Sequence, residues 1–453
     1  MSMDSGAWTT NASTWDCSVN DALAERGASA PRTPRLRTNL VAMMMWQIGN
    51  YLVPLATFPY LTRVLGAAHF GVLAYATAVA TYGMLVTEWG FFLSGPKAVV
   101  ECRGEPDALN ELVWSTMAAK ACLCAASLAA LLVVARFDTH IAAAFPVMLA
   151  ACLTVVANVF TLNWLLQGLE RFAVFSTVSL AGRFLSLPLT FLFVRTRDDL
   201  AIAAAIQGMA AVMTGLFSVI AARRLGALRR PRLSIRSVWQ RLRESADMFV
   251  SSASVSLLGV TNSVILGSTA SVYQVGLYTA ADRLKTMANM VPAQVNTVFY
   301  PRVAALSLSD PRKAAQLTAI GAAATLMLTV AGVAALTWLA VPLTALVLGS
   351  GYEGSAPVLR LLCLATVFGN VAYFVGLQVL VPFGETRKRS ISMLAAGVLN
   401  VVLALVLTPR YGAIGAAVSF LIAEIAIAAV YVFIVLSSPV LRRHFSQLMT
   451  HAR

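Results

Sequence analysis

Several charged side chains lie inside the long apolar stretches of this 453-residue chain. A charge in the hydrocarbon region of a membrane is costly, so it usually faces a water-filled path, a ligand or a partner charge. Arginine and lysine bind oxyanions there through charge-assisted hydrogen bonds, so an excess of bases favours an anionic ligand over an organic cation. The bases are Lys120, Arg183, Arg283, Lys285 and Arg360; the acids are Glu88, Asp282 and Glu424, with Asp247 at the start of another stretch.

The bases differ in their expected depth. Lys120 lies about nine residues from the inner end of its stretch and Arg183 is central in its own, so we expect both to face a central cavity. Arg360 lies about one turn from the end of a stretch, where its side chain can instead extend to the membrane surface. Together with Arg63 at the first outer turn, the predicted substrate-binding bases are Lys120, Arg183, Arg283, Lys285, Arg360 and Arg63.

Three carboxylates, Glu88, Asp282 and Glu424, are candidates for ion coupling. A lone buried carboxylate can carry a proton, or it can pair with a base on a neighbouring helix, and both interpretations remain open here. Asp282, Arg283 and Lys285 fall on adjacent parts of one helix surface. A structural charge network is therefore an equal alternative to a binding site at these three residues.

The elements that carry these charges are predicted to be membrane-spanning helices. Apolar residues make up 58% of the chain and charged residues 12%, too few to cover a soluble protein of this size. Apolar runs of about twenty residues recur from Leu40 to Leu436, and a run of that length crosses the hydrocarbon core as a helix. We predict an all-α polytopic membrane protein with about twelve spans, near residues 39–61, 71–94, 112–135, 142–165, 173–194, 200–221, 247–268, 276–299, 316–340, 357–381, 391–408 and 413–436.

The distribution of arginine and lysine predicts the orientation of these spans. Short cytoplasmic loops carry the excess of basic residues in membrane proteins. With the N-terminus inside, the inner segments hold 24 basic residues and the outer loops hold 5. We therefore expect a multi-pass membrane protein with both termini in the cytoplasm.

An arginine-rich linker divides the chain near its midpoint. Residues 223–243 contain eight arginines, which predict either an amphipathic helix on anionic headgroups of the inner leaflet or a solvated connection. Similar small-residue turns, 65–78 and 266–281, begin corresponding spans on either side of it, as in transporters built from repeats. The predicted organisation is a disordered cytoplasmic tail (1–38), a six-helix bundle (39–221), a basic cytoplasmic linker (222–245), a second six-helix bundle (246–437) and a cytoplasmic tail (438–453).

Composition and spacing disfavour other classes of protein. Basic cytoplasmic loops account for the net charge of +14, so we expect no nucleic-acid partner. The six cysteines and four histidines show no metal-ligand spacing, and we expect no metal site, disulfide or cofactor. The sequence has neither a large loop between spans nor clustered Asp and His residues, so we expect no enzymatic activity and no catalytic residue.

Four motifs, read in order along the chain, resemble those of a known family. The first is PLATFPYLTRVLG at 54–66, followed by Phe70-Gly71. The others are NWLLQGLE at 163–170, the stretch from VGLY at 275–278 to YPR at 300–302, and YGAIGAA at 411–417. In kind and order they are similar to those of Wzx-type flippases for O-antigen and exopolysaccharide, in the multidrug/oligosaccharidyl-lipid/polysaccharide superfamily.

The resemblance implies a V-shaped bundle, like that of MATE transporters, made of two six-helix halves. Such flippases move undecaprenyl-diphosphate-linked oligosaccharide repeat units from the cytoplasmic to the periplasmic leaflet by alternating access coupled to an ion gradient. A cationic lumen receives the diphosphate and the sugar while the polyprenyl tail stays in lipid. The implied partners are this lipid-linked oligosaccharide, membrane lipid, a polysaccharide polymerase and a chain-length regulator.

Two alternatives remain within the same superfamily. An ion-coupled exporter of organic cations should centre on carboxylates, whereas the deep groups here are Lys120 and Arg183. A lipid II flippase resembles the same family but typically has two additional helices. Twelve predicted spans therefore favour the polysaccharide flippase.

Overall fold

Helices make up most of the described part of the protein. The structure, a computed structural model, describes residues 36–137, 144–309, 311–382 and 384–438. These residues contain no strand, which confirms the predicted all-α class; the predicted tails lie almost entirely outside them. The helices are α2 (Leu36–Glu88), α3 (Phe91–Glu101), α4 (Pro106–Phe137), α6 (Phe145–Phe160), α7 (Asn163–Gly168), α8 (Phe172–Phe193), α9 (Leu200–Arg224), α10 (Ile235–Gly259), α11 (Thr261–Thr269), α12 (Val272–Ala288), α13 (Met290–Ser309), α14 (Pro311–Trp338), α15 (Ala340–Leu348), α16 (Ser355–Phe374), the π-helix η1 (Val375–Leu380) and α17 (Thr386–Ser437).

The two longest helices each contain two potential spans. α2 has 53 residues and α17 has 52, whereas about twenty residues cross a bilayer. Each is interrupted by one glycine with non-helical dihedral angles, Gly66 (φ 70°, ψ 170°) in α2 and Gly412 (φ 55°, ψ −133°) in α17. Glycine adopts a positive φ at little steric cost, so each provides a turn between an outgoing and a returning helix.

The described helices can be compared with the twelve predicted spans. Eight helices are long and apolar enough to cross a membrane, or nine when α10 and α11, which meet at a 53° bend, form one span. When α2 and α17 are each divided at their glycine, the number of candidate spans rises from nine to eleven. The less apolar pair α12 and α13 occupies the place of the eighth predicted span. The described helices are thus consistent with twelve spans.

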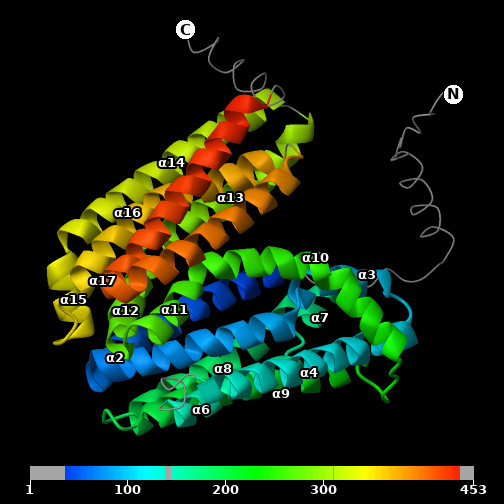
Figure 1. The fold of residues 1–453 in the computed structure, drawn as a ribbon. Coiled ribbons are helices and arrows are strands. Elements are labelled where there is room, and N and C mark those ends of the chain that lie inside the picture. Colours follow the sequence, from blue (N-terminus) through cyan, green and yellow to red (C-terminus); the bar gives the residue numbers. More distant parts are fainter. Residues whose placement is uncertain (1–35, 138–143, 310, 383, 439–453) are drawn as a thin grey trace, which may run out of the picture.

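The helices form two bundles that meet at one end and diverge at the other (Figure 1). The N-terminal lobe contains α2 to α9, and the C-terminal lobe contains α11 to α17. α10 connects them, because it packs against α3 and α4 of one lobe and against α17 of the other. It begins at Ile235, inside the segment predicted as a basic linker (222–245). The V shape agrees with the predicted fold.

Two glycines let the lobes approach backbone to backbone at the end where they meet. Gly71 lies in the second half of α2 and Gly276 lies in α12. A Cβ atom on Gly71 would lie 1.7 Å from the backbone oxygen of Val272, and one on Gly276 would lie 2.0 Å from the backbone oxygen of Ala67. No side chain fits at either position unless the helices separate. We call this contact, residues 67–71 against 272–276, the glycine seam.

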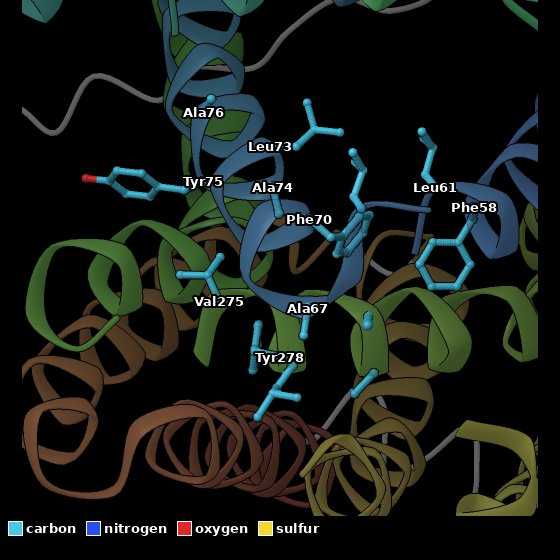
Figure 2. Packing of buried hydrophobic residues seen from close by; sticks show 14 of the residues in the cluster. Phe58, Leu61, Ala67, Phe70, Leu73, Ala74, Tyr75, Ala76, Val275 and Tyr278 are labelled. Carbon is cyan, nitrogen blue, oxygen red and sulfur yellow. The ribbon is translucent and has the colours of Figure 1, made fainter. Parts of the chain in front are cut away.

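A buried apolar cluster surrounds the glycine seam (Figure 2). Tyr75 of α2 and Val275 of α12 are fully buried beside it, and Tyr278 is 2% exposed. The hydroxyl groups of Tyr75 and Ser268 share a hydrogen bond of 3.0 Å. The lobes therefore make a close, mainly apolar contact at this end.

Candidate functional site

A cavity of about 520 Å³ opens among the helices of the N-terminal lobe. Its walls come mainly from α2, α6, α8 and α9, and α12 of the C-terminal lobe contributes Arg283. Arg183 and Arg283 are the only charged side chains in its described lining. We call this space the cationic cavity.

The two arginines of the cationic cavity come from different lobes. Arg183 lies on α8 and Arg283 lies on α12, and both side chains are exposed to the space between the helices. The guanidinium carbon of Arg283 lies 5.9 Å from the centre of the Phe58 ring of α2, within the range of a cation–π contact. Neither guanidinium has a carboxylate within salt-bridge distance in the described chain. Both are therefore available to an anion.

Polar side chains in the cavity wall have unused hydrogen-bonding capacity. The Oδ1 atoms of Asn50 and Asn163 and the Oγ atom of Ser179 are buried and have no hydrogen-bond partner in the described structure. Buried polar atoms are normally paired. A ligand rich in hydroxyl groups, or water, can complete these pairs after a small rearrangement of the side chains.

Lys120 lies outside the lining of the cationic cavity. Its side chain is 1% exposed, and its Nζ atom donates to Oε2 of Glu88 at 2.7 Å. The backbone oxygens of Asn158 and Thr161 each lie 3.4 Å from the same Nζ atom, and both of these residues line the cavity. The structure thus joins a predicted substrate-binding base on α4 to a predicted ion-coupling acid on α2.

A second group of charges lies in the C-terminal lobe. Lys285 Nζ donates to Asp282 Oδ1 at 2.6 Å and lies 4.9 Å from the centre of the Phe420 ring of α17. Glu424 lies one turn further along α17 and makes no hydrogen bond or ion pair with the described residues. Lys285 also borders a small cavity of about 20 Å³ lined by Asn289, Thr329 and Thr366.

The remaining two predicted bases are exposed and do not line the cationic cavity. Arg63 donates to the backbone oxygen of Leu346, which links α2 to α15. Arg360 Nε lies 3.4 Å from the backbone oxygen of Thr337. A role for either in substrate binding stays a prediction.

The family of the chain follows from a comparison with known proteins. Residues 36–307, more than half of the sequence, match the family described as "Polysaccharide biosynthesis protein". The chain belongs to this family. The resemblance to Wzx-type flippases, predicted from four motifs, is thereby confirmed.

One relative in Escherichia coli (strain K12) bears the name "Putative O-antigen transporter". It is 28% identical over 395 residues, which cover 86% of this chain and 94% of the relative. Among solved structures, the lipid II flippase MurJ in an inward closed conformation has a TM-score of 0.69 at 14% identity, covering 88% of each chain. An inward-facing MATE multidrug resistance transporter has a TM-score of 0.67 at 15% identity, covering 92% of this chain and all of that one. This polysaccharide biosynthesis protein therefore shares the fold of both structures.

The uncharged polar lining of the cavity was not predicted from the sequence. Asn50, Asn158 and Gln207 lie inside apolar stretches, so their polarity was the available signal. Polar uncharged residues are also common where membrane helices pack against each other. Their spacing in the sequence therefore does not distinguish a residue in a helix contact from one in a cavity wall. The tertiary arrangement supplies that distinction.

Proposed function

We propose that this protein is a flippase that moves undecaprenyl-diphosphate-linked oligosaccharide repeat units from the cytoplasmic to the periplasmic leaflet of the bacterial inner membrane. The observation that carries the proposal is the cationic cavity, whose described lining holds Arg183 and Arg283 and no carboxylate. The names of the O-antigen transporter and of the lipid II flippase support the same chemical class of substrate. The product serves surface or extracellular polysaccharide synthesis.

The diphosphate would bind between the two arginines. Each guanidinium presents several N–H donors to phosphate oxygens, and such charge-assisted bonds are strong where water is scarce. Because Arg183 and Arg283 belong to different lobes, a diphosphate that contacts both favours lobe arrangements that keep them close. Substrate binding is in this way coupled to the relative position of the lobes, as alternating access requires.

The oligosaccharide would occupy the uncharged part of the cavity. Its hydroxyl groups can pair with the unsatisfied oxygens of Asn50, Asn163 and Ser179, and the Trp46 and Phe58 rings offer apolar faces for sugars. The polyprenyl tail stays in lipid.

Translocation changes no covalent bond, so no catalytic residue or cofactor is needed. A polysaccharide polymerase and a chain-length regulator would act on the product.

Replacement of Arg183 or Arg283 by Gln tests this proposal. Each change removes charge-assisted hydrogen bonds that contribute about 1.5–3 kcal/mol, so transport is expected to fall about 10- to 100-fold. The measurement is surface polysaccharide in a host that lacks its own flippase, with the amount of inserted protein determined in parallel.

Arg410→Gln is the matched control, because Arg410 is an exposed arginine of α17 that does not line the cavity. Full polysaccharide assembly in both cavity variants would overturn the assignment of the diphosphate site. Export of organic cations by the wild-type protein, without restoration of polysaccharide, would favour the multidrug exporter. Rescue of cells depleted of their lipid II flippase, without restoration of polysaccharide, would favour that activity.

We further propose that Glu424 and the adjacent Asp282–Lys285 pair couple transport to an ion gradient. Glu424 makes no hydrogen bond or ion pair with the described residues, and its described electrostatic neighbour is Lys285. Lys285 pairs with Asp282 within α12 and reaches α17 through the Phe420 ring. A cation that binds Glu424 would alter the charge balance between these two helices. The N-terminal acid Glu88 is instead engaged by Lys120.

Glu424→Gln is expected to uncouple transport from a proton gradient while leaving the protein folded, since Gln retains the size of the side chain. Flipping of the lipid-linked oligosaccharide is measured in proteoliposomes with and without an imposed pH gradient. Stimulation by the gradient should disappear in the variant and persist in Glu353→Gln, an exposed acid in the turn before α16. Unchanged stimulation in Glu424→Gln would exclude this carboxylate as the coupling group.

A further inference from the structure

The arginine-rich linker is attached to the N-terminal lobe through its backbone. The Arg229 N–H donates to Asn110 Oδ1 at 2.7 Å, and Asn110 Nδ2 donates to the Arg230 oxygen at 2.9 Å. Trp114 Nε1 donates to the Arg229 oxygen at 3.2 Å. Both anchoring side chains belong to the first turns of α4. The linker is therefore a docked segment, which disfavours the solvated connection considered from the sequence.

The positive charge of this segment is largely unneutralised. Of the eight arginines, two have a described carboxylate partner: Arg232 with Asp107 at 3.1 Å and Arg241 with Glu244 at 2.9 Å. The other six are all exposed and make no ion pair with the described residues: Arg223, Arg224, Arg229, Arg230, Arg236 and Arg243. Such a concentration of unpaired cations repels itself unless anions lie against it.

Large apolar side chains are exposed beside these cations. Ile235 is 90% exposed, Trp239 is 69% exposed and Leu233 is 58% exposed. Arg236, Trp239 and Arg243 are spaced by three and four residues, so they share one face of α10. We call this surface the linker face; it consists of Leu233, Ile235, Arg236, Trp239 and Arg243.

The opposite face of α10 is held by the N-terminal lobe. Ser237 Oγ donates to Glu111 Oε1 of α4, and Trp89 Nε1 donates to the Leu242 oxygen at 2.9 Å. The hydroxyl groups of Ser245 and Ser94 share a hydrogen bond of 2.7 Å. These contacts fix the rotation of the helix, so the linker face is directed away from the protein.

We propose that the linker face binds the headgroups of anionic phospholipids in the inner leaflet. Arginine matches phosphate geometry, and tryptophan prefers the boundary between hydrocarbon and water. A helix that combines cations with exposed apolar residues is typical of segments that lie on anionic membranes. α10 begins at the end where the lobes diverge, beside the first turns of the α4 span (Figure 1). The linker face thus lies at the depth in the membrane where lipid headgroups are expected. A soluble acidic partner would bind it only if the linker face projected into the cytoplasm.

This lipid contact would act on the segment that joins the lobes. α10 packs against α3 and α4 through its first half and against α17 further along, where Asn400 Nδ2 donates to the Leu257 oxygen. Headgroups on the linker face hold the first half of α10 at the membrane surface while the C-terminal lobe changes its position.

The test measures the response of Trp239 to lipid in the full-length protein in detergent micelles. The signal of Trp239 is obtained by subtracting the emission spectrum of Trp239→Phe from that of the wild-type protein. Micelles containing either protein are titrated with phosphatidylglycerol or with phosphatidylcholine. Phosphatidylglycerol is expected to shift and saturate the signal, whereas phosphatidylcholine gives a much weaker response. An arginine near an anionic surface contributes about five-fold in affinity, so Arg236→Gln with Arg243→Gln is expected to weaken binding roughly 30-fold.

The matched control removes two exposed arginines elsewhere, Arg197→Gln with Arg410→Gln, and should bind phosphatidylglycerol as the wild-type protein does. Equal responses to both lipids would overturn the proposal, as would equal losses in the two double variants. A response to water-soluble glycerol phosphate of the same affinity would also overturn it, because the apolar anchors would then contribute nothing.

Discussion

Lys120→Met is expected to destabilise the protein strongly, and a second change, Glu88→Gln, to restore most of that stability. Lys120 is buried and its Nζ atom lies 2.7 Å from Glu88, so the single change leaves a largely buried carboxylate without its partner. Breaking a buried ion pair from one side costs about 3–5 kcal/mol; the lower end applies because the Glu88 side chain keeps 25% exposure. The measurement is the thermal unfolding temperature of the purified variants.

The double variant also separates two roles for Lys120. If Lys120 positions the α2–α4 contact, polysaccharide assembly should return together with stability in Lys120→Met/Glu88→Gln. If Lys120 binds the diphosphate directly, the double variant should be stable and inactive. Lys97→Met is the matched control, since Lys97 and Glu101 form an exposed pair at 3.9 Å, and such pairs contribute less than about 1 kcal/mol.

Gly71→Ala is expected to open the glycine seam, which lies at the predicted first outer turn, between the spans at 39–61 and 71–94. The change should favour an arrangement in which the cationic cavity is reached from that outer side. The new Cβ would lie 1.7 Å from the Val272 oxygen, an overlap with backbone that only a separation of α2 and α12 can relieve. Overpacking of this kind costs about 1–3 kcal/mol, so the population of the seam-closed state should fall roughly 5- to 100-fold. Transport should fall as well, because alternating access needs both states.

Accessibility of the cavity from outside measures this shift. A single cysteine at Ser186, which lines the cavity, is placed in a background without the six native cysteines. A membrane-impermeant maleimide added to intact cells should label it faster in Gly71→Ala than in the parent. Gly332→Ala is the control, because a Cβ on this α14 glycine has no neighbour within 4 Å. An unchanged labelling rate in Gly71→Ala would show that the seam is ordinary packing rather than the outer gate.

The sequence was sufficient for the features that depend on composition and periodicity. Apolar runs from Leu40 to Leu436 predicted an all-α membrane protein, and the turns at Gly66 and Gly412 separate helices that the structure draws as one element. The motif at 54–66 with Phe70-Gly71 predicted the family that the comparison confirms. These features are local, because the hydrophobic thickness of the bilayer and the conformational freedom of glycine act on short segments.

The partners of the buried charges depend on the tertiary structure alone. Because they lie deep in their predicted spans, Lys120 and Arg183 were the strongest candidates for the cavity. For Arg283, a binding site and a structural charge network were equal alternatives. The structure places both Arg183 and Arg283 in the lining of the cationic cavity, whereas Lys120 lies outside that lining and pairs with Glu88.

The reason is geometric. Position along a span sets how deep a side chain lies, but the rotation of the helix and the packing of its neighbours set the direction in which it points. The sequence by itself thus determined that this chain is a helical membrane protein of the polysaccharide biosynthesis family with charges inside its spans. Only the packing of α2, α4, α8 and α12 decided which of those charges face each other and which face the cavity.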